Sequence, residues 1–130
     1  MMAKLERSPQ PARMEAVSRD ALVQAALQEI NQNYREASLS NVARAYGVSL
    51  AYVSECVRAQ TGRTYKELLQ KHRMETAARL LRRSDLNIQQ IIAQVGYENT
   101  SYFYRLFHER YGLSPREYRQ VRAVRSRTTA

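Results

Sequence analysis

The sequence has little of what disulfide-linked, metal-binding or membrane proteins require. Cys56 is the only cysteine in the 130 residues, so neither an intrachain disulfide nor a site built from several thiolates can form. No run of 18 or more apolar residues occurs, and the N-terminus lacks the apolar core of a signal peptide. His72 and His108 have no metal-ligand spacing. These absences predict a cytoplasmic protein without a membrane partner, a metal or a cofactor.

Catalytic motifs are missing as well. The sequence has no Gly-rich phosphate loop, no nucleophile elbow and no paired-carboxylate arrangement. Enzymatic activity is therefore not expected. Cys56 lies in a helical pattern, which favours a small core residue over a redox role.

Segments with the period-2 alternation of β-strands are also missing, so the expected class is all-α, with about seven helices. Helix-capping residues (Ser, Thr, Asn) and glycine stops divide the chain. The expected helices run from Ser18 to about Tyr34, from Ser38 or Ser40 to Gly47, from Leu50 to Gly62, from Tyr65 to about Arg83, from Asn87 to Gly96, from Asn99 to Gly112, and onward from Pro115. Residues 1–17, with Pro9 and Pro11, are expected to be a disordered lead-in or linker; 18–122 form the helical domain, and 123–130 a basic tail.

Positive charge is concentrated in one part of the chain. Lysine and arginine number 21 against 12 acidic residues, giving a net charge of +9 and a pI near 10.1. Residues 1–38 carry equal numbers of acidic and basic side chains, so the whole excess lies beyond them. This distribution predicts a polyanionic partner, either nucleic acid or an anionic membrane surface.

The chain contains an internal repeat. A shift of 49 and then 50 positions superposes Val42, Ala43, Gly47, Val53, Val57 and Gly62 on Ile91, Ile92, Gly96, Phe103, Phe107 and Gly112. Each copy is a short helix, a glycine turn and a second helix, which is helix-turn-helix organisation. The helix from Tyr65 to about Arg82 joins the copies and spans ~27 Å. With its flanking turns it approaches the ~34 Å of one DNA turn, so the second helix of each copy, the reading helix, is predicted to enter one of two successive major grooves.

The reading helix of the second copy buries Phe103, Phe107 and Tyr111 on one stripe. The side chains expected to face outward, and to read base edges, are Asn99, Thr100, Ser101, Tyr104 and Arg105. Arg105 can grip a guanine bidentately. The alternatives are a phosphate contact or an ion pair with Glu109.

The reading helix of the first copy buries Val53 and Val57 and is expected to expose Ala51, Ser54 and Glu55 as its base-reading positions. Glu55 either accepts from cytosine N4 or is a solvated or salt-bridged side chain. The positions expected to contact phosphate are Ser49, Arg58, Arg63, Lys66, Arg116 and Arg119.

Four segments carry a resemblance to a known family: residues 73–81 (RMETAARLL), 88–97 (IQQIIAQVGY), 101–107 (SYFYRLF) and 112–119 (GLSPREYR). Residues 38–119 resemble the DNA-binding domain of AraC/XylS bacterial transcription regulators. The resemblance implies two helix-turn-helix units that bind double-stranded promoter DNA, usually recruit RNA polymerase, and contact DNA at Thr100, Ser101, Tyr104 and Arg105. The family usually has larger polar or basic readers in the first unit, where this chain has small residues and an acid.

The resemblance implies a sequence-specific transcription regulator. Activation is expected, although the sequence does not decide activator from repressor, and the isolated domain is expected to be monomeric. The family usually places this domain behind a sensor or dimerisation domain, so the chain is either a stand-alone regulator or a fragment of a longer one. Two other functions remain open: a helical module that binds an acidic protein, and a binder of nucleic acid or membranes driven by charge alone. The repeated units favour sequence-specific DNA binding, because charge alone requires no repeat at the spacing of one DNA turn.

Overall fold

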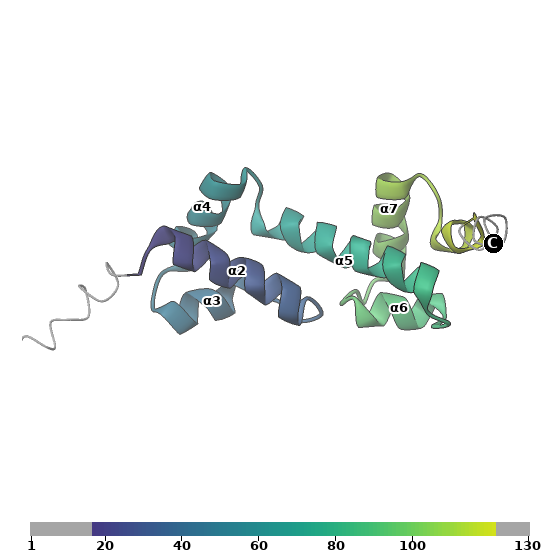
Figure 1. Ribbon diagram of the computed structural model, residues 1–130, viewed down its shortest axis with the longest axis horizontal. Coiled ribbons are helices and arrows are strands. Elements are labelled where there is room, and N and C mark those ends of the chain that lie inside the picture. The colour runs from purple at the N-terminus through teal and green to yellow at the C-terminus, as the bar shows by residue number, and fades with distance from the viewer. Residues whose placement is uncertain (1–16, 122–130) are drawn as a thin grey trace, which may run out of the picture. The chain divides into compact units, whose positions relative to one another are not determined.

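The computed structural model describes residues 17–121, and they are helical throughout apart from turns and connections (Figure 1). The helices are α2 (Arg19–Asn33), α3 (Leu39–Tyr46), α4 (Leu50–Thr61), α5 (Tyr65–Arg83), α6 (Ile88–Gln94) and α7 (Thr100–Tyr111), followed by a helical segment at 115–121. Residues 17–121 contain no strand, which confirms the all-α prediction. The predicted lead-in, apart from residue 17, and the predicted basic tail lie outside the described residues.

The chain forms two compact units. Within the described residues, the first unit comprises 17–33 and 37–69, and the second comprises 34–36 and 70–121. The helix α5 contributes to both, because Leu69 belongs to the first unit and Gln70 to the second. Each unit contains one copy of the predicted helix-turn-helix repeat. The predicted limits of a single domain over 18–122 remain a prediction.

In the first unit α2, α3 and α4 pack against one another. The α2 residues Leu22, Ala26 and Ile30 recur at four-residue intervals, so they share one face, and all three are buried. They meet Val53 and Val57 of α4, which are fully buried. Cys56 lies in the same core, as predicted for a small core residue.

In the second unit α6 and α7 pack on the C-terminal part of α5 (Figure 1). Phe103 and Phe107 are fully buried at its centre, one helical turn apart. The ring of Phe107 lies 4.6 Å from that of Tyr111 and 5.5 Å from that of Tyr118, between centroids. The stripe predicted from the sequence is therefore the core of this unit, with Tyr111 at its half-buried edge.

Local capping sets most helix ends where the sequence predicts them. Ser49 and Asn99 cap α4 and α7, and Gly112 ends α7 with φ +74°. The helix α6 is shorter than expected, because it ends at Gln94 with Val95 as its C-cap, and Gly96 (φ +98°) lies in the turn that follows. Within residues 17–121 no helix is both long and apolar enough to span a bilayer.

Candidate nucleic-acid interface

The helix α7 presents a polar surface at its N-terminal end. The side-chain oxygen of Asn99 accepts a hydrogen bond from the Tyr102 backbone N–H at 2.9 Å, which caps the helix. Burial of Phe103 and Phe107 turns Ser101, Tyr104 and Arg105 outward, where all three are exposed, and Thr100 is half-buried. The outward face is thus the one predicted from the sequence, and base contact by these side chains remains a prediction.

Arg105 is held in a defined position by Tyr102. Its guanidinium carbon lies 5.0 Å from the centroid of the Tyr102 ring, a cation–π contact. The Tyr102 hydroxyl accepts a hydrogen bond from the Gln70 side-chain amide at 2.8 Å, and Tyr97 contacts the same ring edge-on. Tyr102 therefore serves as a fixed platform beneath Arg105. Within the described residues Arg105 forms no ion pair with Glu109.

The helix α4, like α7, is capped by a side chain at its N-terminal end and exposes its first turns, but the exposed side chains differ. The Ser49 hydroxyl accepts from the Tyr52 N–H at 3.0 Å and caps the helix. Ala51, Ser54 and Glu55 are exposed, as expected from the inward positions of Val53 and Val57.

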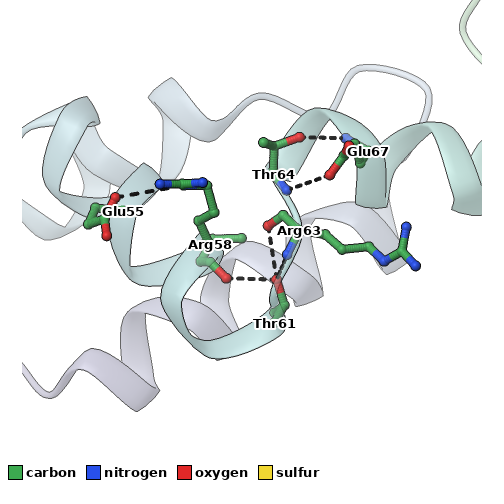
Figure 2. A network of polar contacts seen from close by, with 7 residues as sticks. Glu55, Arg58, Thr61, Arg63, Thr64 and Glu67 are labelled. Atoms are coloured by element: carbon green, nitrogen blue, oxygen red, sulfur yellow. Dashed lines mark hydrogen bonds and ion pairs between the residues drawn. The ribbon is translucent and has the colours of Figure 1, made fainter.

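Glu55 is paired within α4. Its carboxylate lies 3.9 Å from Nε of Arg58, and each side chain is more than 60% exposed (Figure 2). This is the salt-bridged alternative considered for Glu55. Because exposed pairs of this kind contribute little free energy, both side chains remain available to a ligand.

The turn from α4 to α5 carries two of the predicted phosphate ligands. The Thr61 hydroxyl donates to the Val57 carbonyl at 2.7 Å and accepts from the Arg63 N–H at 3.1 Å. Thr64 and Glu67 then form a reciprocal capping box at the start of α5, with bonds of 2.9 and 3.1 Å (Figure 2). This rigid turn leaves Arg63 and Lys66 exposed, and Figure 2 shows the Arg63 side chain extending away from it.

One predicted phosphate ligand, Arg119, also makes hydrogen bonds within the protein. The guanidinium of Arg119 is half-buried and donates to the carbonyl oxygens of Leu81 and Ser84 at 3.0 and 3.2 Å, and to that of Leu80 at 3.5 Å. These carbonyls lie at the end of α5, where the last acceptors of a helix lack intrahelical donors, and that of Leu80 also accepts from the Ser84 N–H and hydroxyl. Arg119 thus caps α5, and a phosphate contact by this side chain remains a prediction. Arg116 in the same segment is exposed, as a phosphate contact requires.

Sequence reasoning missed an arginine in the first unit. The guanidinium carbon of Arg19, at the start of α2, lies 5.7 Å from the centroid of the Tyr52 ring of α4. A hydrogen bond to Tyr52 raises the pKa of Arg19, which is fully charged at neutral pH. Arg19 lies in the electrically neutral part of the sequence, and neither charge counting nor helical periodicity indicates it.

Within residues 17–121 no group of three or more His, Cys, Asp or Glu side chains is placed to hold a metal ion. The surface of these residues offers capped helix ends, amides, hydroxyls and guanidinium groups. These donors match the acceptors of phosphates and base edges.

Comparison with known proteins identifies the family. A family model described as a helix-turn-helix domain matches residues 42–121, which is more than half of the chain. The chain belongs to the AraC/XylS-type helix-turn-helix family. The resemblance stated from the sequence is confirmed.

Several members of the AraC/XylS family are similar to this chain. The transcriptional activator NphR of a Rhodococcus species is 36% identical over 96 residues, which are 72% of this chain and 28% of NphR. The C-terminal domain of AraT, a response regulator from Geobacillus stearothermophilus, superposes with a TM-score of 0.72 at 36% identity, covering 78% of this chain and 85% of that one. The DNA-binding domain of AdpA, solved with a target DNA, shares the fold (TM-score 0.71, 21% identity, 80% of this chain and 94% of that one). The chain thus spans just over a quarter of the length of NphR.

Proposed function

We propose that this chain is the DNA-binding part of a bacterial transcription regulator, and that its two reading helices, α4 and α7, enter successive major grooves of promoter DNA. The proposal rests on the observation that both units contain a helix of the same construction. In each unit a side-chain-capped helix buries two apolar residues one turn apart and exposes its first polar turns. A helix of this kind presents its N-terminal residues to base edges in a major groove.

The reading positions follow from the exposed faces. We assign base contacts in the second unit to Asn99, Thr100, Ser101, Tyr104 and Arg105, and in the first unit to Ala51, Ser54 and Glu55. Phosphate contacts are assigned to Ser49, Arg58, Arg63, Lys66 and Arg116, because these side chains are exposed and polar or positively charged. Sequence discrimination should come mainly from α7, because α4 offers only small side chains and one acid at its reading positions.

We further propose that the complete regulator activates transcription. NphR is named as a transcriptional activator, and this chain corresponds to just over a quarter of it. The remaining length of such relatives is consistent with a separate sensor or dimerisation domain. RNA polymerase is the partner that activation would require, and the bacterial cytoplasm is where promoter DNA is found.

The decisive experiment selects random DNA duplexes with the purified 130-residue chain and sequences the enriched pool. We expect two short sequence blocks about 10 base pairs apart, the spacing of successive major grooves. A single block would restrict base reading to one helix, and no enrichment would contradict sequence-specific binding.

A salt titration tests the mode of binding independently. Neutralising about 6–8 phosphates predicts a log–log slope of affinity against salt of about −5 to −7 on duplex DNA. A slope of about −1 to −2 corresponds to one or two phosphates and would contradict docking in two grooves.

A further inference from the structure

Each of the two reading helices has a tyrosine with a guanidinium group over its ring, at positions that are equivalent in the internal repeat. The third residue of each helix is a tyrosine, Tyr52 in α4 and Tyr102 in α7, and a guanidinium lies over each ring. In the second unit that guanidinium belongs to Arg105, three residues further along the same helix. The equivalent position in the first unit is Glu55, and the guanidinium over Tyr52 comes instead from Arg19 of α2.

The position of Arg19 relative to the reading face follows from helix geometry. Residues three apart are neighbours on one face of a helix, so Tyr52 and Glu55 lie side by side on α4. Arg19 lies on this side of α4, because its guanidinium carbon is 5.7 Å from the centroid of the Tyr52 ring. Arg19 and Tyr52 are both exposed, and Tyr52 keeps 41% of its surface accessible. A positive charge is therefore present beside the acidic residue on the reading face.

The start of α2 is fixed against α4 by other contacts. The Asp20 carboxylate accepts a hydrogen bond from the Gln60 side-chain amide of α4 at 2.8 Å. The Ser18 hydroxyl accepts from the Ala21 N–H at 3.0 Å and caps α2. Because residues on both sides of it are held, Arg19 reaches the Tyr52 ring from a fixed backbone position, which lowers the entropy lost when it binds a ligand.

We infer that Arg19 binds a backbone phosphate of DNA beside the first reading helix, with Tyr52 as its platform, and so supplies the guanidinium that this unit lacks at Glu55. The inference rests on the proposed DNA-binding function and adds a residue to it. A guanidinium carries five N–H groups, so its interaction with Tyr52 leaves others available, and a pair of N–H groups matches two phosphate oxygens. Phosphate is favoured over a base because Arg19 comes from a neighbouring helix, at the flank of α4 and outside its reading face.

The test compares Arg19→Ala with Arg35→Ala by fluorescence anisotropy on a selected duplex and on a random duplex. Arg35 is the matched control, because it is an exposed arginine that follows the C-terminal end of α2, whereas Arg19 lies at the N-terminal end of this 15-residue helix, which is ~22 Å long. Each variant removes one positive charge, so their difference reports the local contact.

We expect Arg19→Ala to weaken binding to both duplexes by the same factor and to reduce the magnitude of the salt slope by about 1. The ratio of wild-type to Arg19→Ala affinity should then fall about 3.5-fold between about 50 and 200 mM salt. Arg35→Ala should retain the wild-type slope. Equal slopes for the two variants would overturn the inference, and so would a loss confined to the selected duplex, which would mean that Arg19 reads a base.

Tyr52→Ala completes the test, since it removes the platform and keeps the charge. If Tyr52 acts through Arg19, Tyr52→Ala weakens binding in the wild-type background and has no further effect in Arg19→Ala. Independent, additive losses would overturn the platform role. Failure of the wild-type chain to bind any duplex would refute the proposed function itself, whereas wild-type binding with an unchanged Arg19→Ala variant would refute only this inference.

Discussion

Nε of Arg73 donates a hydrogen bond to the carbonyl oxygen of Tyr34 at 2.9 Å, although 39 positions separate the two residues. Its Nη2 donates to the next carbonyl, that of Arg35, at 3.2 Å. The same guanidinium lies 5.2 Å from the centroid of the Tyr97 ring. Through these contacts a side chain of α5 holds the connection between α2 and α3 within the second unit.

Replacing Arg73 with methionine should therefore lower the free energy of unfolding by about 2 kcal/mol, because two hydrogen bonds from a charged donor are lost while most of the apolar stem is kept. Arg79→Met is the control, since Arg79 is exposed on the same helix and its replacement should change stability by less than about 0.5 kcal/mol. Urea denaturation of both variants measures the difference. Equal stabilities would mean that the Arg73 contacts are not maintained in solution.

Gly96 should tolerate alanine less well than Gly112. Both have positive φ, so alanine at Gly112 (φ +74°), where no atom lies within 4 Å of an added Cβ, should cost about 1–2 kcal/mol of backbone strain. At Gly96 (φ +98°) the added Cβ would lie 2.6 Å from the Arg35 carbonyl oxygen. Overpacking then adds about 1–3 kcal/mol. Thermal denaturation should rank wild type, Gly112→Ala and Gly96→Ala in descending stability, and a reversed order for the two variants would contradict the close approach.

Phe107→Ala should destabilise the protein by about 3–5 kcal/mol, because it opens a cavity among the rings at the centre of the second unit. Tyr104→Ala on the same helix removes an aromatic ring that is 38% exposed and should have a much smaller effect. Denaturant unfolding of the two variants provides the measurement. If Phe107→Ala unfolded at the wild-type midpoint, the core assignment would be wrong.

His72 should make stability depend on pH near neutrality. Its ring lies 5.2 Å from that of Tyr34, and burial, with a smaller contribution from Arg79, lowers its pKa below the usual 6.5, while Glu75 opposes the change. The unfolded chain then binds a proton at a higher pH than the folded chain. Stability is therefore fully present above about pH 6.5 and decreases as the pH falls through 6.5 toward the lower pKa of the folded state.

Urea unfolding at several pH values measures this dependence. His72→Gln should remove the part of the decrease that arises between pH 7.5 and the folded-state pKa. His108→Gln, which replaces an exposed histidine on α7, should retain it. A His72→Gln profile parallel to that of the wild type would exclude His72 as the source.

Arg105→Ala should reduce discrimination among DNA sequences. If Arg105 grips a guanine, the variant loses about 1–3 kcal/mol of preference at one base pair, while binding to random duplexes changes much less. Arg116→Ala should weaken selected and random duplexes equally, as expected for a phosphate contact. Competition binding against duplexes substituted at single positions distinguishes the two. Equal losses on all sequences for Arg105→Ala would reassign it to the DNA backbone.

The features that the sequence predicts well are those decided by neighbouring residues. Ser49 and Gly62 delimit α4, and Asn99 and Gly112 delimit α7, because capping and left-handed turns depend on side chains within one helical turn. The burial of Phe103 and Phe107 follows from their spacing in the same way. The end of α6 is less well predicted, because Val95 provides a C-cap before the chain reaches Gly96.

The features that the sequence does not predict are contacts between distant residues. Arg119 appears in the sequence as a free positive charge near the C-terminus, but it reaches the Leu81 carbonyl 38 positions away. The Arg19–Tyr52 and Arg73–Tyr34 contacts likewise join separate helices or connections, and no local pattern encodes them. Charge and periodicity identify which residues can bind DNA, whereas tertiary contacts decide which of those are already engaged within the protein.

The placement of residues 34–36 in the second unit bears on how the two repeats can be exchanged between homologous regulators. A chimera cut within α5 at Leu69 would retain α2, α3 and α4, yet it would lack the arginine that holds their connecting segment. Such a graft retains these contacts only if the donor supplies an arginine at position 73 and a glycine at position 96. The repeats of this protein are therefore duplicated in sequence without being interchangeable parts.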